Sequence, residues 1–153
     1  MAISTYAAAR TVCEASHWSV SNLRIQKVIY LASMAFMSRT GGPLVFEPFE
    51  AWDYGPVLPD LYSTLKMYGA RPVRYGFYRT APLEAETREG RELEQACAFL
   101  LKQPPARLID FTQREDGAWA RNYIPGKRAA IIPNDHIIEE GRTLFGARTV
   151  HGA

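Results

Sequence analysis

Residues 44–59 read LVFEPFEAWDYGPVLP and form the segment of the chain that is richest in aromatic residues and prolines. Proline lacks an amide donor and clashes with the preceding helical turn, so this segment is too interrupted for a long helix, and it is too apolar for a free loop. Residues 49–54 alternate in character, which predicts a short strand. Gly55-Pro56 predicts a turn after the strand, and Pro59 suits the first turn of a following helix.

The predicted strand has two different faces. Phe49 and Ala51 are expected to point into the core, which places Trp52 and Tyr54 on the opposite face. On that face they need a covering helix or a partner. A buried Trp is usually part of a core, whereas exposed Trp and Tyr dominate protein–protein hot spots. The pattern alone leaves both interpretations open.

Two helices are predicted before this strand, over Ser4–His17 and Ser21–Arg39. Each begins with a serine that can serve as its N-cap, and Gly41 with the residues after it ends the second helix. The first half of the second helix is amphipathic, and Lys27 belongs to its polar side. Residues 28–37 are apolar nearly all round, which indicates a central helix with neighbours on several sides.

The rest of the chain is predicted as short helices and one further strand. A helix over Pro59–Tyr68 follows the turn, and Val73–Tyr78 alternates like a strand that could pair with Glu47–Asp53. The last residues, 146–153, are expected to fray. Beyond the second strand we predict helices at Ala81–Lys102, Ala106–Gln113, Ala118–Tyr123 and from Asn134 onward, with a loop over Ile124–Ile132.

Length and composition are those of an ordinary single-domain protein. At 153 residues one domain is expected, and 47% hydrophobic with 22% charged residues is typical of a soluble globular chain. The formal net charge of +2 is too small to imply a nucleic-acid or membrane partner by itself. The longest apolar run, residues 28–38, is far shorter than the ~20 residues of a membrane span, and the N-terminus lacks a signal-peptide pattern. A cytoplasmic location is therefore predicted.

Few side chains are arranged in a pattern that predicts chemistry. Cys13 and Cys97 lie on apolar helix faces and are predicted to be buried free thiols. The histidines are widely separated, so no metal site is supported, and no nucleotide-binding or hydrolase motif is present, so no cofactor is expected. Glu50 and Asp53 are a candidate acid/base pair, but we favour two exposed carboxylates because such pairs are common on protein surfaces.

The segment RPVRYGFYR, residues 71–79, interleaves basic and aromatic residues. Aromatic rings stack on bases and arginines contact phosphates, so Arg71, Arg74, Tyr75 and Arg79 are candidates for binding nucleic acid. The alternative is a half-buried strand whose arginines lie in water. We favour the strand, because the net charge of the chain is nearly neutral.

Residues 23–69 resemble the core of the Panacea domain, the SocA-like antitoxin family. That family shows a helix of the form L-x-x-Q/K-K-L-x-Y-x-A, then G-x-P-L-F, then E-A-W-x-Y-G-P-V-x-P, and a short helix ending in Y-G. The residues of this chain that match are Leu23, Gln26, Lys27, Tyr30, Ala32, Gly42, Pro43, Leu44, Phe46, Glu50, Ala51, Trp52, Tyr54, Gly55, Pro56, Val57, Pro59, Tyr68 and Gly69.

The C-terminal half resembles the family more loosely. Members often carry L-T-H-x-E-x-P-W before a final helix, and this chain has FTQREDGAW at residues 111–119. Gln113 stands where histidine is common, and Ala118 stands where proline is common. The resemblance covers roughly residues 4–145.

The resemblance implies a mainly helical domain with a small β element, compact around the central helix at about residues 21–39. It also implies a non-enzymatic antitoxin that neutralises a cognate protein toxin by direct contact. In some members it implies an adaptor that hands the toxin to a Clp-type protease. The residues that we predict for partner contact, or for holding the contact surface, are Trp52, Asp53, Tyr54, Arg24, Arg114 and Trp119.

Overall fold

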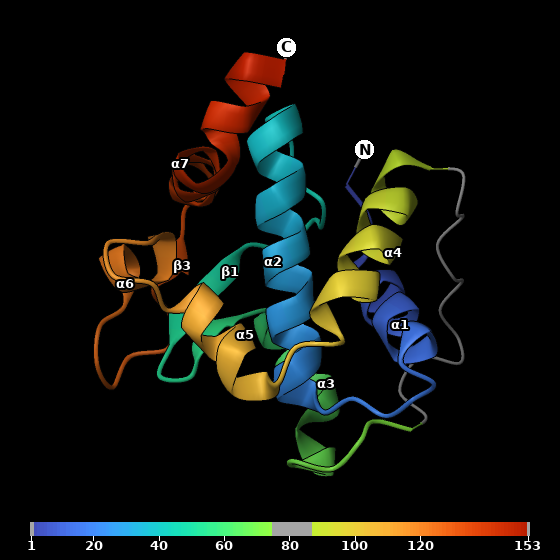
Figure 1. The fold of residues 1–153 in the computed structure, drawn as a ribbon. Helices are drawn as coiled ribbons and strands as arrows, with labels where there is room; N and C mark the ends of the chain where they lie inside the picture. Colours follow the sequence, from blue (N-terminus) through green and yellow to red (C-terminus); the bar gives the residue numbers. More distant parts are fainter. Residues whose placement is uncertain (1, 75–86, 153) are drawn as a thin grey trace.

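The computed structural model describes residues 2–74 and 87–152. The fold is mainly helical with a small antiparallel sheet, as the resemblance implied (Figure 1). Its elements in chain order are α1 (Thr5–Ala15), α2 (Asn22–Thr40), β1 (Phe49–Trp52), β2 (Gly55–Val57), α3 (Pro59–Leu65), the 3-10 turn η1 (Lys66–Tyr68), α4 (Arg88–Leu100), α5 (Pro105–Thr112), α6 (Ala118–Asn122), β3 (Ile131–Ile132) and α7 (Asn134–Gly152).

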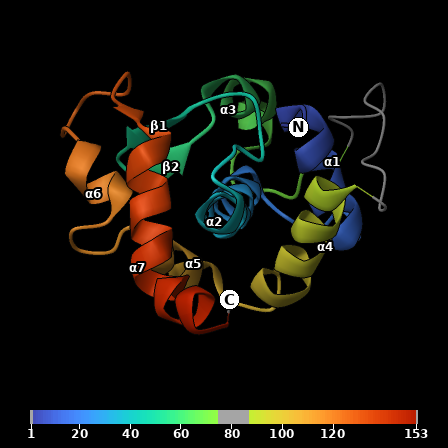
Figure 2. The ribbon, with the colours of Figure 1, turned by 90° about the horizontal axis from the view of Figure 1, so that it is seen from above.

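Helix α2 is the centre of the molecule, which confirms the prediction from its apolar sequence. The Ser21 side chain caps its N-terminus by accepting a hydrogen bond from the Arg24 amide at 3.3 Å. Its C-terminus ends at Gly41, which has a left-handed φ of 78°. Figure 2 looks along α2 and shows α1, α3, α4, α5 and α7 arranged around it. The central helix therefore packs against five of the other helices and against β2.

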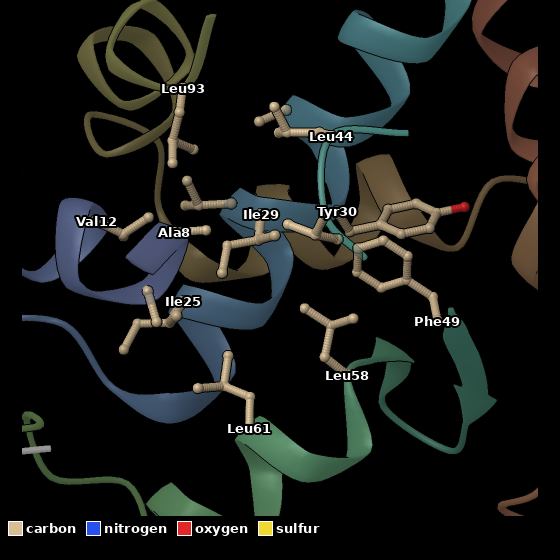
Figure 3. Packing of buried hydrophobic residues seen from close by; sticks show 14 of the residues in the cluster. Ala8, Val12, Ile25, Ile29, Tyr30, Leu44, Phe49, Leu58, Leu61 and Leu93 are labelled. Atoms are coloured by element: carbon tan, nitrogen blue, oxygen red, sulfur yellow. The ribbon is translucent and has the colours of Figure 1, made fainter. Parts of the chain in front are cut away.

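The core forms where side chains of α1, α2, α4 and the β1–α3 region meet (Figure 3). Tyr30 of α2 and Phe49 of β1 pack edge to face, with ring centroids 5.0 Å apart and an interplanar angle of 87°. Both rings are buried. An aromatic pair of this geometry adds to the free energy of burial, so it fastens the sheet to the central helix.

The sheet has the strand order β2-β1-β3, and both pairings are antiparallel. The predicted strand is confirmed at Phe49–Trp52, and β2 pairs with it across a two-residue turn. Pro56 is tolerated in β2 because that strand lies at the edge of the sheet. The prediction missed β3, because a strand of two residues leaves no alternation to detect. Among the described residues, β2 and β3 occupy the two edges of β1. The pairing predicted for Val73–Tyr78 falls mostly outside those residues.

The other predicted helices agree with the structure to within a few residues, except that α7 continues to Gly152 through residues that were expected to fray. The turn predicted at Gly55-Pro56 lies at Asp53-Tyr54 instead, because Gly55–Val57 pairs with β1 as a strand. Residues 75–86, which hold most of the second predicted strand and the start of the helix predicted at Ala81, lie outside the described residues. Val73 is described, and its amide donates to the Val20 carbonyl at 2.9 Å. Cys13 and Cys97 are buried and free, as predicted. None of the described helices is both long and apolar enough to cross a membrane.

Candidate functional site

The hairpin of β1 and β2 presents its turn, Asp53-Tyr54, at the molecular surface. Gly55 follows the turn with a φ of 115°, a conformation that residues with a side chain rarely adopt. A Cβ at this position would also lie 2.9 Å from Lys27 Nζ. Glycine is therefore required at this position for two reasons, the backbone conformation and the close approach of the lysine.

Lys27 lies beneath the hairpin, and only 1% of its surface is exposed. Its Nζ donates a hydrogen bond to the Pro56 carbonyl at 3.3 Å. Burial lowers the pKa of Lys27 to about 7, because the charged ammonium loses its hydration. The prediction placed Lys27 on the polar side of α2, and that placement is wrong. The amine supports the β2 backbone instead of facing solvent.

Gln26, the neighbour of Lys27, fastens the chain where it enters α3. Its Oε1 accepts from the Leu58 amide at 2.8 Å, and its Nε2 donates to the Leu58 carbonyl at 3.4 Å and to Asn22 Oδ1 at 3.3 Å. Gln26 is buried, so an unpaired carboxamide there would be costly. Lys27 thus holds strand β2, and Gln26 holds the start of α3 that follows it.

Trp52 is 9% exposed and is covered from within the chain. Its ring packs against Tyr62 of α3 with centroids 4.9 Å apart, and the Arg128 guanidinium lies 4.3 Å from the ring centroid. Its Nε1 donates to Glu50 Oε1 at 2.9 Å. Tyr54, on the same strand face by prediction, is 74% exposed. The structure thus separates the two residues that the pattern could not distinguish.

Helix α6 is fastened to the outer side of the hairpin. Trp119 Nε1 donates to the Trp52 carbonyl at 2.8 Å, and its ring stacks on Tyr123 with centroids 4.5 Å apart. The Tyr123 hydroxyl donates to Asp53 Oδ1 at 2.6 Å, and this hydrogen bond raises the pKa of Tyr123. The turn is therefore held from α6 as well as from α2, and both carboxylates of the candidate acid/base pair accept a hydrogen bond from an aromatic side chain.

Arg114 and Arg24, which we predicted for partner contact, both bind groups of this chain. Arg114 Nε lies 3.6 Å from Glu140 Oε2, and Glu140 Oε1 accepts from the Ala118 amide at 2.7 Å. Burial raises the pKa of Glu140, against the opposing effects of that amide and of Arg114. The Arg24 guanidinium donates to the carbonyls of Leu101 and Gln103 after α4. Contact of these arginines with a partner stays a prediction.

A groove of about 330 Å³ opens beside the hairpin, and we name it the hairpin groove. It brings together Trp52 and Tyr54 from the predicted set, whereas Asp53, Arg24, Arg114 and Trp119 lie outside its lining. Leu23 at its rim is 37% exposed. The residues that line it are Asn22, Leu23, Gln26, Trp52, Tyr54, Val57, Tyr62, Lys66, Gly69, Ala70 and Arg128.

A second groove of about 460 Å³ lies between α2, α4, α5 and α7, and we name it the helix groove. Phe99 in it is 59% exposed. Sequence reasoning missed this groove because its residues are far apart along the chain and none of them is among the residues that match the family pattern. Its lining consists of Leu31, Met34, Ala35, Glu92, Gln95, Ala96, Phe99, Leu100, Phe111, Arg114, Leu144 and Phe145.

The candidate nucleic-acid segment is only partly described. The Arg71 guanidinium donates to the carbonyls of Met67 at 3.0 Å and Tyr68 at 3.1 Å, so it closes the turn after α3. Arg74 is exposed. Tyr75 and Arg79 lie outside the described residues. Over the part of the chain that the structure describes, no group of three or more His, Cys, Asp or Glu side chains is placed to hold a metal ion.

Comparison with known proteins places the hairpin and most of its supports within a region that matches a known family. The profile of the family described as antitoxin SocA-like, Panacea domain, matches residues 25–120. The chain belongs to this family. Antitoxin SocA of Caulobacter vibrioides (strain NA1000 / CB15N) is 42% identical in an alignment 111 residues long, which covers 65% of this chain and 58% of that protein. The chain thus spans less than two thirds of that relative's length. No solved structure matches the chain.

The part of the chain that matches the Panacea family contains most supports of the hairpin described above, but Tyr123, which binds Asp53, lies beyond its end. Lys27, Gly55 and Trp119 lie within it, and so do both strands of the hairpin. Arg128 and helix α7 lie beyond its end. Each groove therefore combines a wall from the matched region with residues from outside it.

Proposed function

We propose that this chain is an antitoxin that neutralises a cognate protein toxin by binding it directly, in the cytoplasm and without catalysis of its own. The observation that carries the proposal is membership of the SocA-like, Panacea domain family, together with 42% identity to a protein named antitoxin SocA. The two grooves support it, because exposed apolar side chains such as Tyr54 and Phe99 are typical of protein-interaction surfaces.

Co-expression with the product of the neighbouring gene tests this proposal. We expect the two proteins to purify as a stable complex, and we expect the chain to restore growth of cells that express the toxin. If both proteins are soluble but form no complex and growth is not restored, the proposal is wrong.

The proposal extends to the fate of the bound toxin, which we suggest is delivered to a Clp-type protease. The family resemblance supports this step, since it implies an adaptor in some members. The half-life of the toxin, measured after synthesis is stopped, should shorten when the chain and the protease are both present. A longer half-life would instead show that the chain protects the toxin by simple sequestration.

An enzymatic role through Glu50 and Asp53 is the weaker alternative. Each carboxylate accepts a hydrogen bond from a neighbouring aromatic side chain, Trp52 in the first case and Tyr123 in the second. We expect Glu50→Gln and Asp53→Asn variants to restore growth as well as the original chain does, because an amide oxygen can still accept these hydrogen bonds. Loss of growth rescue in folded variants that still bind the toxin would favour catalysis.

A further inference from the structure

The hairpin groove carries positive charge on an otherwise apolar and aromatic lining. Among the described residues that line it, only Lys66 and Arg128 are charged, and no acidic side chain is present. Trp52 and Tyr62 form an aromatic wall, and Leu23 with Tyr54 is exposed at the rim. A ligand that fills this groove must therefore be apolar in part and must bring negative charge.

Arg128 differs from the four arginines that form an ion pair with a glutamate. Arg10, Arg39, Arg114 and Arg121 each pair with a glutamate. Within the described residues neither Arg128 nor Lys66 forms an ion pair, and Arg128 instead lies over the rings of Trp52 at 4.3 Å and Tyr62 at 5.6 Å. An arginine held on aromatic faces keeps its N–H donors for a carboxylate, which its planar fork binds with two hydrogen bonds.

The walls of the groove are fixed before any partner binds. The hairpin is held by Lys27 on the Pro56 carbonyl, by Trp119 on the Trp52 carbonyl and by Tyr123 on Asp53. A surface that is already ordered loses little conformational entropy when it binds. Trp, Tyr and Arg are also the residue types that dominate the energetics of protein–protein interfaces.

We propose that the hairpin groove binds a segment of a protein partner in which an Asp or Glu lies next to an apolar or aromatic side chain. The carboxylate pairs with Arg128 and Lys66, and the apolar side chain packs against Trp52, Tyr54 and Leu23. Two cations match a single acidic segment and are too few for a nucleic-acid backbone, which needs a row of them. The partner's identity rests on the proposed function, in which it is the toxin.

The test measures the affinity of the purified chain for the product of the neighbouring gene at two or more salt concentrations. Arg128→Gln should weaken binding by roughly 10-fold to 100-fold and reduce its dependence on salt, because a charge-assisted contact is lost. Lys66→Gln should weaken binding less, since a flexible ammonium makes a less directional contact. Lys127→Gln is the matched control, because it removes the same charge from the neighbouring position outside the groove lining.

A charge exchange makes the test specific for the carboxylate. Arg128→Glu should abolish binding, and one Asp→Arg or Glu→Arg change in the partner should restore it. Melting temperatures of all variants establish that each one is folded. If the original chain binds the partner and Arg128→Gln binds equally well, the inference is wrong and the proposed function stands. If the original chain binds no partner, or if it binds an oligonucleotide through Arg128 instead, both are wrong.

Discussion

The two grooves of this protein differ in how their surfaces are held in place. Residues of the hairpin groove are fixed by hydrogen bonds and ring contacts from α2, α3 and α6, and many of them match the family pattern. The helix groove is the larger and consists mainly of apolar side chains, among which Phe99 projects from α4 into solvent. The walls of the hairpin groove are therefore held by polar and ring contacts, whereas the helix groove is formed mainly by apolar packing between helices.

The largest expected effect tests whether Trp52 belongs to the scaffold. Trp52→Ala should lower the free energy of unfolding by about 3–5 kcal/mol, because a large buried ring is removed from between Tyr62 and Arg128. Tyr54→Ala, on the exposed turn, should change it by less than about 0.5 kcal/mol. Urea denaturation of both variants gives the two values. Equal losses would show that the turn is as firmly packed as the strand.

The next effect tests the close approach of Lys27 to the hairpin. Gly55→Ala should destabilise the protein by about 2–4 kcal/mol, because it combines a strained φ with a Cβ placed against Lys27 Nζ. Gly126→Ala is the matched control, since Gly126 also has a positive φ, of 79°, but has no atom within 4 Å of the added Cβ. Gly126→Ala should lower the free energy of unfolding by about 1–2 kcal/mol, because backbone strain is the only cost there. Similar losses of stability in both variants would mean that the Lys27 side chain can move away from the added Cβ without destabilising the protein.

Lys27 should also make stability depend on pH. Its pKa is about 7 in the folded protein and 10.5 as the ordinary value, so between these the unfolded chain binds more protons. Stability should therefore rise with pH by about 1.4 kcal/mol per unit from this residue, with its full burial penalty present below pH 7. Urea denaturation at pH 7.0 and 8.5 measures the rise.

A pair of lysine variants isolates this contribution. In the original chain the free energy of unfolding should rise by about 2 kcal/mol between pH 7.0 and 8.5. Lys27→Met should abolish this rise, whereas Lys102→Met, at an exposed position, should retain it. The window stops at pH 8.5 because burial raises the pKa of Cys13 and Cys97 to about 12 from 9.0, and this makes stability fall with pH above about 9. An unchanged slope in Lys27→Met would place the titrating group elsewhere.

The smallest effect on stability is expected in the helix groove. Phe99→Ala should change the free energy of unfolding by less than about 0.5 kcal/mol, because the ring is mostly in solvent. Its effect on affinity for the proposed toxin partner, compared with that of Tyr54→Ala, shows which groove contacts that partner. A large loss from Phe99→Ala and none from Tyr54→Ala would assign the interface to the helix groove and contradict the assignment to the hairpin groove.

Several elements could be predicted from the sequence because their signals are local. Ser21 and Gly41 mark the ends of α2, and the apolar run between them predicted its central position correctly. Alternation predicted β1, whereas the turn predicted at Gly55-Pro56 lies at Asp53-Tyr54, and Gly55–Val57 forms the unpredicted strand β2. These features depend on residues within about one or two turns of each other, where spacing and backbone preference act directly.

The candidate site was harder to predict, because its members come from separate segments. Arg128 lies in a loop with no recognisable pattern, yet it covers Trp52. Lys27 was assigned to the polar side of its helix, and a charged residue is rarely buried without a paired charge. Its position depends on a carbonyl of β2 and on a glycine that leaves room for the amine, and neither can be inferred from the helix in which Lys27 lies.

By itself the sequence determined the central helix, the strand beside it and the family to which the chain belongs. These follow from local spacing and from a run of uncommon residues in a fixed order. Tertiary structure alone decided that Trp52 is covered and Tyr54 exposed, that Lys27 lies under the hairpin, and that two grooves form. The physical reason is that burial and charge pairing depend on which segments lie next to each other in space. Around the hairpin these contacts are made by α3, α6 and the loop that carries Arg128.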